Sequence, residues 1–168
     1  MQVESRLQAQ LHQVTIGGHL VTVWDHWRLY LDPALIRAIV ERLEERVRHQ
    51  VESIDYLCPI PRSGIWLGTL LAERLRVPLL NFWWGEGVFC QEYVQQGSRI
   101  VLFDPDVKTG RSLYSALTLL GRIRPTIECL VTVIYHDTYP GDFTMPVKTQ
   151  WFEGGKILYL YRMSELAR

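Results

Sequence analysis

Residues 100–117, IVLFDPDVKTGRSLYSAL, decide the fold of this chain. The stretch opens with a short apolar run, Ile100–Phe103, which predicts a buried strand. A loop follows, and residues 112–123 have the apolar spacing of a helix. Asp104 and Asp106 therefore stand at the carboxyl end of a strand, which is where open α/β sheets bind ligands. The stretch predicts a strand–loop–helix unit with its chemistry in the loop.

The same loop has the features of a phosphate-binding site. Gly110 allows close backbone approach, and Thr109 and Ser112 add hydroxyl groups. The following helix contributes unpaired N–H groups and the positive end of its dipole. The spacing differs from that of the Walker A loop and from the G-x-G-x-x-G fingerprint. Taken alone, DPD at 104–106 is also typical of a simple turn, because Asp and Pro are common turn residues.

Strands and helices alternate on both sides of this stretch. The run CLVTVIY at 129–135 is apolar on both faces, as in a parallel strand covered by helices on two sides. Before the alternation, Asp32 and Pro33 predict the N-cap and first residue of a helix. We therefore expect an α/β fold with a central, mostly parallel sheet flanked by helices. The further expected elements are a hairpin arm at 19–27 after a Gly-Gly pair, strands at 54–60, 77–82 and 157–161, a helix at 65–75, and a short strand at Trp151-Phe152.

Composition and length exclude several classes of protein. The 168 residues suit one domain, and 48% hydrophobic residues suffice for a real core. Eighteen basic residues balance eighteen acidic ones, which argues against a dedicated nucleic-acid binder. The chain has no apolar run long enough to span a membrane, and its polar start, MQVESRLQAQLHQ, lacks the apolar region of a signal peptide. We expect a cytoplasmic protein whose widely spaced cysteines, Cys58, Cys90 and Cys129, are reduced and bind no zinc.

The loop at 104–112 resembles the ribose-5-phosphate signature of type I phosphoribosyltransferases. Aligned without gaps on the Thr-Gly pair, Asp104 takes the first acidic position of that signature and Pro105 the second. This Asp-Pro pair is similar to the variant found in uracil phosphoribosyltransferases. Lys108 stands where a small residue is usual, and Arg111 where glycine is usual.

The resemblance extends over roughly residues 20–135. DHWRLYLDPALIRAIVERL, at 25–43, looks like the opening segment and first helix of orotate phosphoribosyltransferases. DYLCPIPRSGIWLGTLLAERLRVPLL, at 55–80, is similar to their first core strand, pyrophosphate loop, helix and second strand. The arginine fork and the helix-start N–H groups of that loop suit a diphosphate. The resemblance implies a single domain, 1–168, with a core at about 50–136 and a small hood from about 12–30 and 137–168.

The implied function is transfer of ribose-5-phosphate from phosphoribosyl diphosphate to a nucleobase, a pyrimidine or a related base, with release of pyrophosphate. Mg2+ is the implied cofactor, and a homodimer is the usual assembly. The residues implied are Asp104 for the ribose and the metal, Asp106 as a general acid or base, Lys108, Thr109, Gly110, Arg111 and Ser112 for the ribose-5-phosphate, Pro61, Arg62, Ser63 and Gly64 for the pyrophosphate, and Trp151 and Phe152 for the base.

Other interpretations remain open at this point. Residues 81–98 contain no Lys or Arg, whereas orotate enzymes use lysines in this part of the chain, so we expect a base other than orotate. The substitutions in the phosphate loop and this lysine-free segment also fit a non-catalytic sensor of phosphoribosyl diphosphate or a nucleotide. A third interpretation is an interaction module whose aromatic segments, such as Trp83-Trp84, form a dimer surface. For His26 and His136 we expect surface or hydrogen-bonded core positions.

Overall fold

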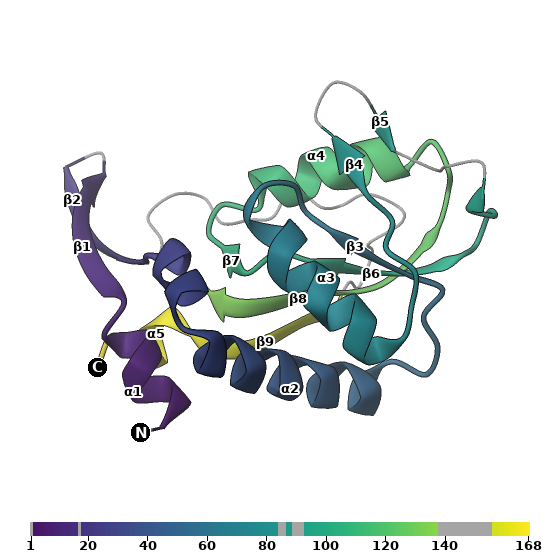
Figure 1. Ribbon diagram of the computed structural model, residues 1–168. Helices are drawn as coiled ribbons and strands as arrows, with labels where there is room; N and C mark the ends of the chain where they lie inside the picture. Colours follow the sequence, from purple (N-terminus) through teal and green to yellow (C-terminus); the bar gives the residue numbers. More distant parts are fainter. Residues whose placement is uncertain (1, 17, 84–86, 89–92, 138–155) are drawn as a thin grey trace.

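A parallel sheet forms the centre of the computed structural model, which describes residues 2–16, 18–83, 87–88, 93–137 and 156–168 (Figure 1). Its strands are β3 (Tyr56–Pro59), β6 (Arg99–Phe103), β7 (Asp106–Val107), β8 (Thr126–Tyr135) and β9 (Lys156–Arg162). Every strand pairing described in this sheet is parallel. β6 and β7 follow one edge of β8 like two halves of an interrupted strand, and β9 pairs with the other edge. The predicted sheet is confirmed.

Helices cover both faces of the sheet (Figure 1). α2 (Pro33–Gln50) and α3 (Ser63–Leu75) lie on one face, and α4 (Arg111–Leu120) lies on the other. Side chains of β6 alternate between the two layers, because successive residues of a strand point to opposite faces. Val101 and Phe103 pack in the cluster that contains α2 and α3, while Ile100 and Leu102 pack with α4. This two-sided burial explains the continuous apolar runs of the sequence.

α2 begins as its sequence predicts. The side chain of Asp32 accepts a hydrogen bond from the backbone N–H of Leu35 at 3.1 Å, and Pro33 occupies the first turn. The apolar residues at helical spacing, Leu35, Ile39, Val40, Leu43 and Val47, are the buried ones.

The N-terminal segments and the last helix gather at one end of the molecule (Figure 1). They are α1 (Val3–Gln8), the hairpin of β1 (Leu11–Ile16) and β2 (His19–Trp24), the 3-10 helix η1 (His26–Leu31) and α5 (Met163–Leu166). The predicted hairpin arm is thus confirmed. Both chain termini lie at this end (Figure 1). The bounds of a hood stay a prediction, but β9, which we expected within it, pairs along most of its length with β8 of the main sheet.

The structure differs from the prediction at 77–82. That segment makes a single bridge, from Leu79 to Leu57, rather than a strand. Pro78 accepts a hydrogen bond from Leu57 but has no N–H to continue the ladder. Instead β4 (Phe82–Trp83) pairs with β5 (Gly87–Val88). The helices also shift slightly: α3 begins at Ser63 rather than at 65, and α4 spans Arg111–Leu120 rather than 112–123.

Candidate phosphate-binding site

The order in which the chain adds strands to the sheet reverses between β3 and β6, although the two strands are parallel. From β3 the chain passes through α3 to the bridge at Leu79, on the outer side of β3. From β6 it passes through α4 to β8, in the opposite direction and over the opposite face. Such a switch point leaves a crevice at the carboxyl ends of the two strands, where open α/β sheets bind ligands. The two loops that resemble phosphate-binding loops are the ones that begin at this point.

The two loops are in direct backbone contact. The N–H of Ile60 donates to the carbonyl oxygen of Phe103 at 2.8 Å. A Cβ on Gly64 would lie 3.0 Å from that same oxygen, and a Cβ on Gly68 would lie 2.7 Å from Cβ of Pro59. Because they lack a Cβ, the two glycines allow the first turns of α3 to pack closely against the ends of β3 and β6. Its N-terminal N–H groups are thereby brought to the carboxyl ends of β3 and β6.

The predicted pyrophosphate loop, Pro61–Gly64, contains an unusual backbone conformation. Arg62 has φ 77° and ψ −96°, a region that non-glycine residues rarely adopt. Such strain persists only where the surrounding structure imposes it, and it is concentrated at functional sites. The side chain of Arg62 is exposed. It is therefore free to meet a diphosphate at the start of α3.

The predicted ribose-phosphate loop leads into α4 through Gly110. This residue has φ 67°, a left-handed conformation that glycine adopts at no steric cost. Thr109, Arg111 and Ser112 are exposed, and the hydroxyl of Thr109 accepts from the N–H of Arg111 at 3.4 Å. Exposed hydroxyl groups and a guanidinium thus lie at the start of α4, beside the N-terminal end of its dipole. Groups of these kinds at a helix N-terminus are suited to a phosphate monoester.

Asp104 lies at the end of β6 and is half-buried. Its burial, with a further contribution from the charge of Asp106, raises the pKa of its carboxyl group to about 7. Its Oδ1 accepts a long contact from the N–H of Asp106 at 3.5 Å. A carboxyl group with such a pKa is close to half-protonated at neutral pH, so an approaching cation or hydroxyl group strongly favours its charged form.

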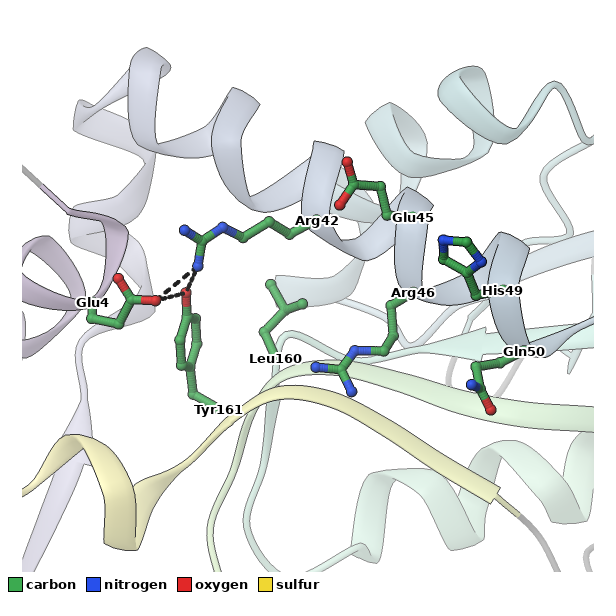
Figure 2. Close-up of a pocket in the computed structure, with 8 residues that line it drawn as sticks. All are labelled: Glu4, Arg42, Glu45, Arg46, His49, Gln50, Leu160 and Tyr161. Atoms are coloured by element: carbon green, nitrogen blue, oxygen red, sulfur yellow. Dashed lines mark hydrogen bonds and ion pairs between the residues drawn. The ribbon is translucent and has the colours of Figure 1, made fainter.

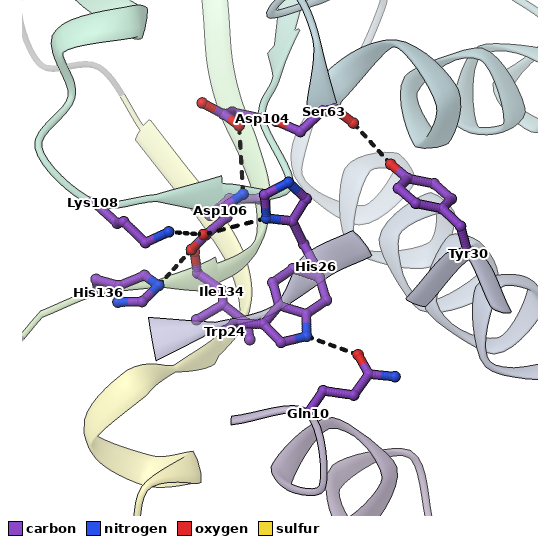
Figure 3. Close-up of polar contacts among 11 residues, drawn as sticks. Gln10, Trp24, His26, Tyr30, Ser63, Asp104, Asp106, Lys108, Ile134 and His136 are labelled. Atoms are coloured by element: carbon purple, nitrogen blue, oxygen red, sulfur yellow. Dashed lines mark hydrogen bonds and ion pairs between the residues drawn. The ribbon is translucent and has the colours of Figure 1, made fainter. Parts of the chain in front are cut away.

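The carboxylate of Asp106 is surrounded by basic groups (Figure 3). It accepts hydrogen bonds from Nε2 of His136 and from Nζ of Lys108, and Nδ1 of His26 lies 3.8 Å from its Oδ2. Burial alone would raise the pKa of Asp106, but the hydrogen bond from His136, the nearby ring of His26 and the charge of Lys108 outweigh it and hold the pKa well below its usual range. Asp106 is therefore a buried, charged anchor.

This cluster bears on three of our expectations. His136 does have a hydrogen-bonded core position, at 1% exposure. Asp106, the candidate acid or base, has its carboxylate engaged with His136 and Lys108, and Lys108, a candidate phosphate ligand, points at Asp106. Their roles toward a ligand stay predictions. The approach of His26 to Asp106 was not predicted, and the sequence carries only an indirect signal for it: a carboxylate in a buried β segment requires partners.

The expected base-binding residues, Trp151 and Phe152, lie outside the described residues. Cys58 and Cys129 are free thiols and buried, as expected, and burial raises the pKa of Cys129 to about 12. Within the described ranges no group of three or more His, Cys, Asp or Glu side chains is arranged to hold a metal ion. In the same ranges, no helix has the length and apolar character to cross a bilayer.

A separate hollow lies between α1, α2 and β9 (Figure 2). Nη1 of Arg42 donates to Glu4 at 2.9 Å and also to the hydroxyl of Tyr161, which itself donates to Glu4 at 3.0 Å. These contacts join the first helix, α2 and the last strand of the sheet. The rest of the hollow has mixed charge, with Glu45 beside Arg46. We assign to it a role in holding the N-terminal helix on the core.

Comparison with solved structures finds the same architecture in several phosphoribosyltransferases. Orotate phosphoribosyltransferase from Aeropyrum pernix has a TM-score of 0.78 and 16% identity, over 98% of this chain and 96% of that chain. Adenine phosphoribosyltransferase from Trypanosoma brucei, in complex with AMP, pyrophosphate and ribose-5-phosphate, has a TM-score of 0.77 and 13% identity, over 98% and 81%. The adenine enzyme from Leishmania tarentolae has a TM-score of 0.75 and 14% identity, over 98% and 88%.

No protein-family model matches the chain, and a search of curated proteins found no match. The likeness therefore rests on the arrangement of helices and strands, and it covers nearly the whole chain. The chain has the type I phosphoribosyltransferase fold.

Proposed function

We propose that this protein is a phosphoribosyltransferase, which transfers ribose-5-phosphate from phosphoribosyl diphosphate to a nucleobase and releases pyrophosphate. One observation carries the proposal: two loops suited to phosphate groups meet at the switch point of a sheet whose fold is shared with adenine and orotate phosphoribosyltransferases. Phosphoribosyl diphosphate has a diphosphate at one end and a monophosphate at the other. A site with two adjacent phosphate cradles is matched to such a ligand.

Each loop has a distinct task in this proposal. Arg62 and the N-terminal N–H groups of α3 bind the diphosphate and stabilise the negative charge that develops on it as it leaves. Thr109, Gly110 and the first turn of α4 bind the 5-phosphate. Asp104, the first residue of the second loop, orders the ribose hydroxyl groups. No nucleophile from the protein is needed, since the attacking group is a nitrogen of the base, so catalysis consists of positioning and charge stabilisation.

Asp104 is also the residue we propose to hold Mg2+. Mg2+ is commonly bound through one or two carboxylates together with phosphate oxygens of the substrate. The half-buried carboxyl group of Asp104 fits that donor set, because its raised pKa reports a charge that lacks compensation. When bound, the ion supplies positive charge to the diphosphate.

The acceptor we propose is a pyrimidine or a related base other than orotate. The known neighbours act on different bases, so the proposal rests on the sequence at 81–98, which has no basic residue to compensate an anionic base. Trp151 and Phe152 are the proposed base-stacking residues.

A second candidate function is a non-catalytic sensor of phosphoribosyl diphosphate or a nucleotide. Asp106 favours it, since hydrogen bonds from His136 and Lys108 occupy the carboxylate that would otherwise act as acid or base. The bulky Lys108 and Arg111 in the phosphate loop favour it as well.

We also propose a cytoplasmic homodimer. Large apolar side chains are exposed on η1 and α3: Leu31 at 85%, Trp66 at 66% and Trp27 at 54%. The two elements are linked by the hydrogen bond from Tyr30 to Ser63. Exposed apolar groups gathered on neighbouring elements mark contact surfaces between proteins.

The experiment that tests the transferase mixes the protein with phosphoribosyl diphosphate, Mg2+ and one base at a time, and follows pyrophosphate release. The panel includes uracil, cytosine, adenine, guanine, hypoxanthine and orotate. We expect release that depends on one uncharged base and is lost in Thr109→Ala. Absence of release with every base, in a protein that binds phosphoribosyl diphosphate, would replace the transferase by the sensor.

A further inference from the structure

The 3-10 helix η1 contacts both phosphate loops, with one side chain for each (Figure 3). The hydroxyl of Tyr30 donates to the backbone carbonyl of Ser63 at 2.9 Å, where the predicted pyrophosphate loop Pro61–Gly64 enters α3. Four residues earlier, Nδ1 of His26 lies 3.8 Å from Oδ2 of Asp106, in the loop before α4. Both η1 side chains are partly buried. A six-residue segment outside the sheet thus spans the site from one loop to the other.

η1 is itself held by a row of aromatic rings. The ring centroids of Trp24 and His26 are 6.0 Å apart, those of His26 and Trp27 are 4.8 Å apart, and those of Trp27 and Tyr30 are 5.8 Å apart. Trp24 is 2% exposed, and its Nε1 donates to Oε1 of Gln10 at 2.9 Å. Aromatic side chains in such contacts have few rotamers to lose and pack rigidly. The row therefore anchors η1 to the N-terminal hairpin as a stiff element.

The contact at the Asp106 end is equally fixed. Asp106 belongs to β7, which pairs with Ile134 of β8, and its carboxylate also accepts from His136 directly after β8. At the other end, Ser63 is the first residue of α3. η1 thus connects the start of one phosphate-binding helix to the sheet segment that precedes the other.

We propose that η1 is a strut that sets the relative position of the two phosphate loops, with His26 and Tyr30 as positioning residues. This inference rests on the proposed function, since it concerns a ligand that occupies both loops at once. The affinity of such a ligand depends on how well the spacing of the two half-sites is preorganised. A ligand that occupies one loop alone is insensitive to that spacing.

The chain offers closely matched variants. Tyr30→Phe removes one hydroxyl and nothing else, and its control is Tyr56→Phe, because the hydroxyl of Tyr56 likewise donates to a backbone carbonyl, that of Tyr93, at 3.0 Å. His26→Phe keeps a ring against Trp24 and Trp27 but removes the nitrogen that faces Asp106. His26→Asn places an amide nitrogen near the position of Nδ1 and is the conservative rescue.

The measurement is titration calorimetry with three ligands in the presence of Mg2+: phosphoribosyl diphosphate, ribose-5-phosphate and pyrophosphate. Tyr30→Phe is expected to weaken the binding of phosphoribosyl diphosphate by about threefold to tenfold, the range of one hydrogen bond. His26→Phe removes a polar contact at 3.8 Å and no hydrogen bond, so it is expected to weaken that binding by a smaller factor. Each variant is expected to change the affinity for ribose-5-phosphate and for pyrophosphate, which each occupy one loop, by less than about twofold. His26→Asn recovers most of the loss, and Tyr56→Phe binds all three ligands like the wild type.

Three results would contradict the proposed role of η1 as a strut. They differ in whether they also contradict the proposed function. Equal weakening of all three ligands would show local damage to a loop instead of altered spacing. Unchanged affinity for phosphoribosyl diphosphate in both variants would contradict the role of η1 as a strut and would leave the proposed function unaffected. No binding of phosphoribosyl diphosphate to the wild type would remove both. If His26→Phe fails to fold, Tyr30→Phe decides the question alone, since it removes only one hydroxyl oxygen.

Discussion

Nε2 of His136 is hydrogen-bonded to Oδ1 of Asp106, and both side chains are almost fully buried, at 1% and 3% exposure. The pair joins the segment after β8 to the loop that leads into α4. A buried carboxylate costs several kcal/mol unless donors surround it. The hydrogen bond from His136 therefore holds Asp106 in one position relative to β8. With Lys108 as a further donor, it holds the phosphate loop to the sheet.

Replacement of His136 should destabilise the folded chain, because the Asp106 carboxylate stays buried with fewer hydrogen-bond donors. We expect His136→Leu to lower the free energy of unfolding by about 2–4 kcal/mol, because it leaves a buried charge with one donor fewer. His136→Gln retains a donor and should lose less. His49→Leu, at an exposed position near the end of α2, is the control and should change little. Urea denaturation at pH 7 makes the comparison, and a loss no greater than that of the control would contradict the assigned role of the pair.

Asp104 predicts an unusual dependence of stability on pH. Its pKa is about 7 in the folded chain, against an ordinary value of 3.8. Between these values the folded chain holds a proton that the unfolded chain has released, so this carboxyl group lowers the stability as the pH rises from about 4 to about 7, with no further effect above. In metal-free and ligand-free protein, Asp104→Asn should therefore stabilise the fold more at pH 8 than at pH 5, by roughly 1–3 kcal/mol.

Asp137→Asn is the control for the pH measurement. Hydrogen bonds from Ser164 help to hold the pKa of Asp137 below its ordinary value despite the opposing effect of burial, so its contribution is lost only as the pH falls toward and below about 4. Its effect should be constant from pH 5 to pH 8. An Asp104→Asn effect that is equally constant would show that Asp104 carries no raised pKa.

Arg62 should combine strain with ligand binding. Arg62→Gly relieves a backbone conformation at φ 77°, which costs a non-glycine residue about 1 kcal/mol or more, so the free energy of unfolding should stay equal or rise despite the loss of a side chain. The affinity for phosphoribosyl diphosphate should fall by about tenfold or more, because a charged fork is lost. Arg76→Gly, at φ 60° after α3, is the matched control and should leave the affinity unchanged. A clear decrease in the free energy of unfolding in Arg62→Gly would contradict the claim that the backbone of Arg62 is strained.

The exposed apolar residues of η1 and α3 predict an effect on assembly. In sedimentation velocity we expect the wild type to run as a dimer, and Trp66→Ser or Leu31→Ser to shift it toward the monomer. Tyr114→Ser changes an aromatic residue that is 43% exposed on α4, over the other face of the sheet, and should leave the dimer intact. A monomeric wild type would remove the homodimer from the proposal.

Local sequence patterns were sufficient for β3, β6, β8 and β9 and for the helices that cover them, but not for β7, which lies within the segment expected to be a loop. Runs such as Val101–Phe103 and Leu130–Ile134 are buried on both sides by α2, α3 and α4. This two-sided burial is directly visible as a run that is apolar except for the buried Thr132. The N-terminal cap of α2 follows from Asp32 and Pro33 for equally local reasons. The failure at 77–82 is also local in origin, because Pro78 removes one ladder donor from an apolar run that otherwise resembles a strand.

Contacts between distant residues required the structure. The meeting of His136 and Asp106 depends on the register of β7 against β8, in which Val107 faces Tyr135. The contact of His26 with the same carboxylate depends on how η1 lies over the loops, which no local pattern encodes. The base-binding role of Trp151 and Phe152 remains a prediction, since they lie outside the described residues.

The most direct measurement is calorimetric titration of the wild type, Arg62→Ala and Thr109→Ala with phosphoribosyl diphosphate and Mg2+, with Arg122→Ala, an exposed arginine after α4, as the control. Arg62 and Thr109 stand in the two different loops. We predict saturable 1:1 binding to the wild type and to Arg122→Ala, and a loss of about tenfold or more in each loop variant. Absence of binding to the wild type, or binding that is indifferent to both loop variants, would contradict the account.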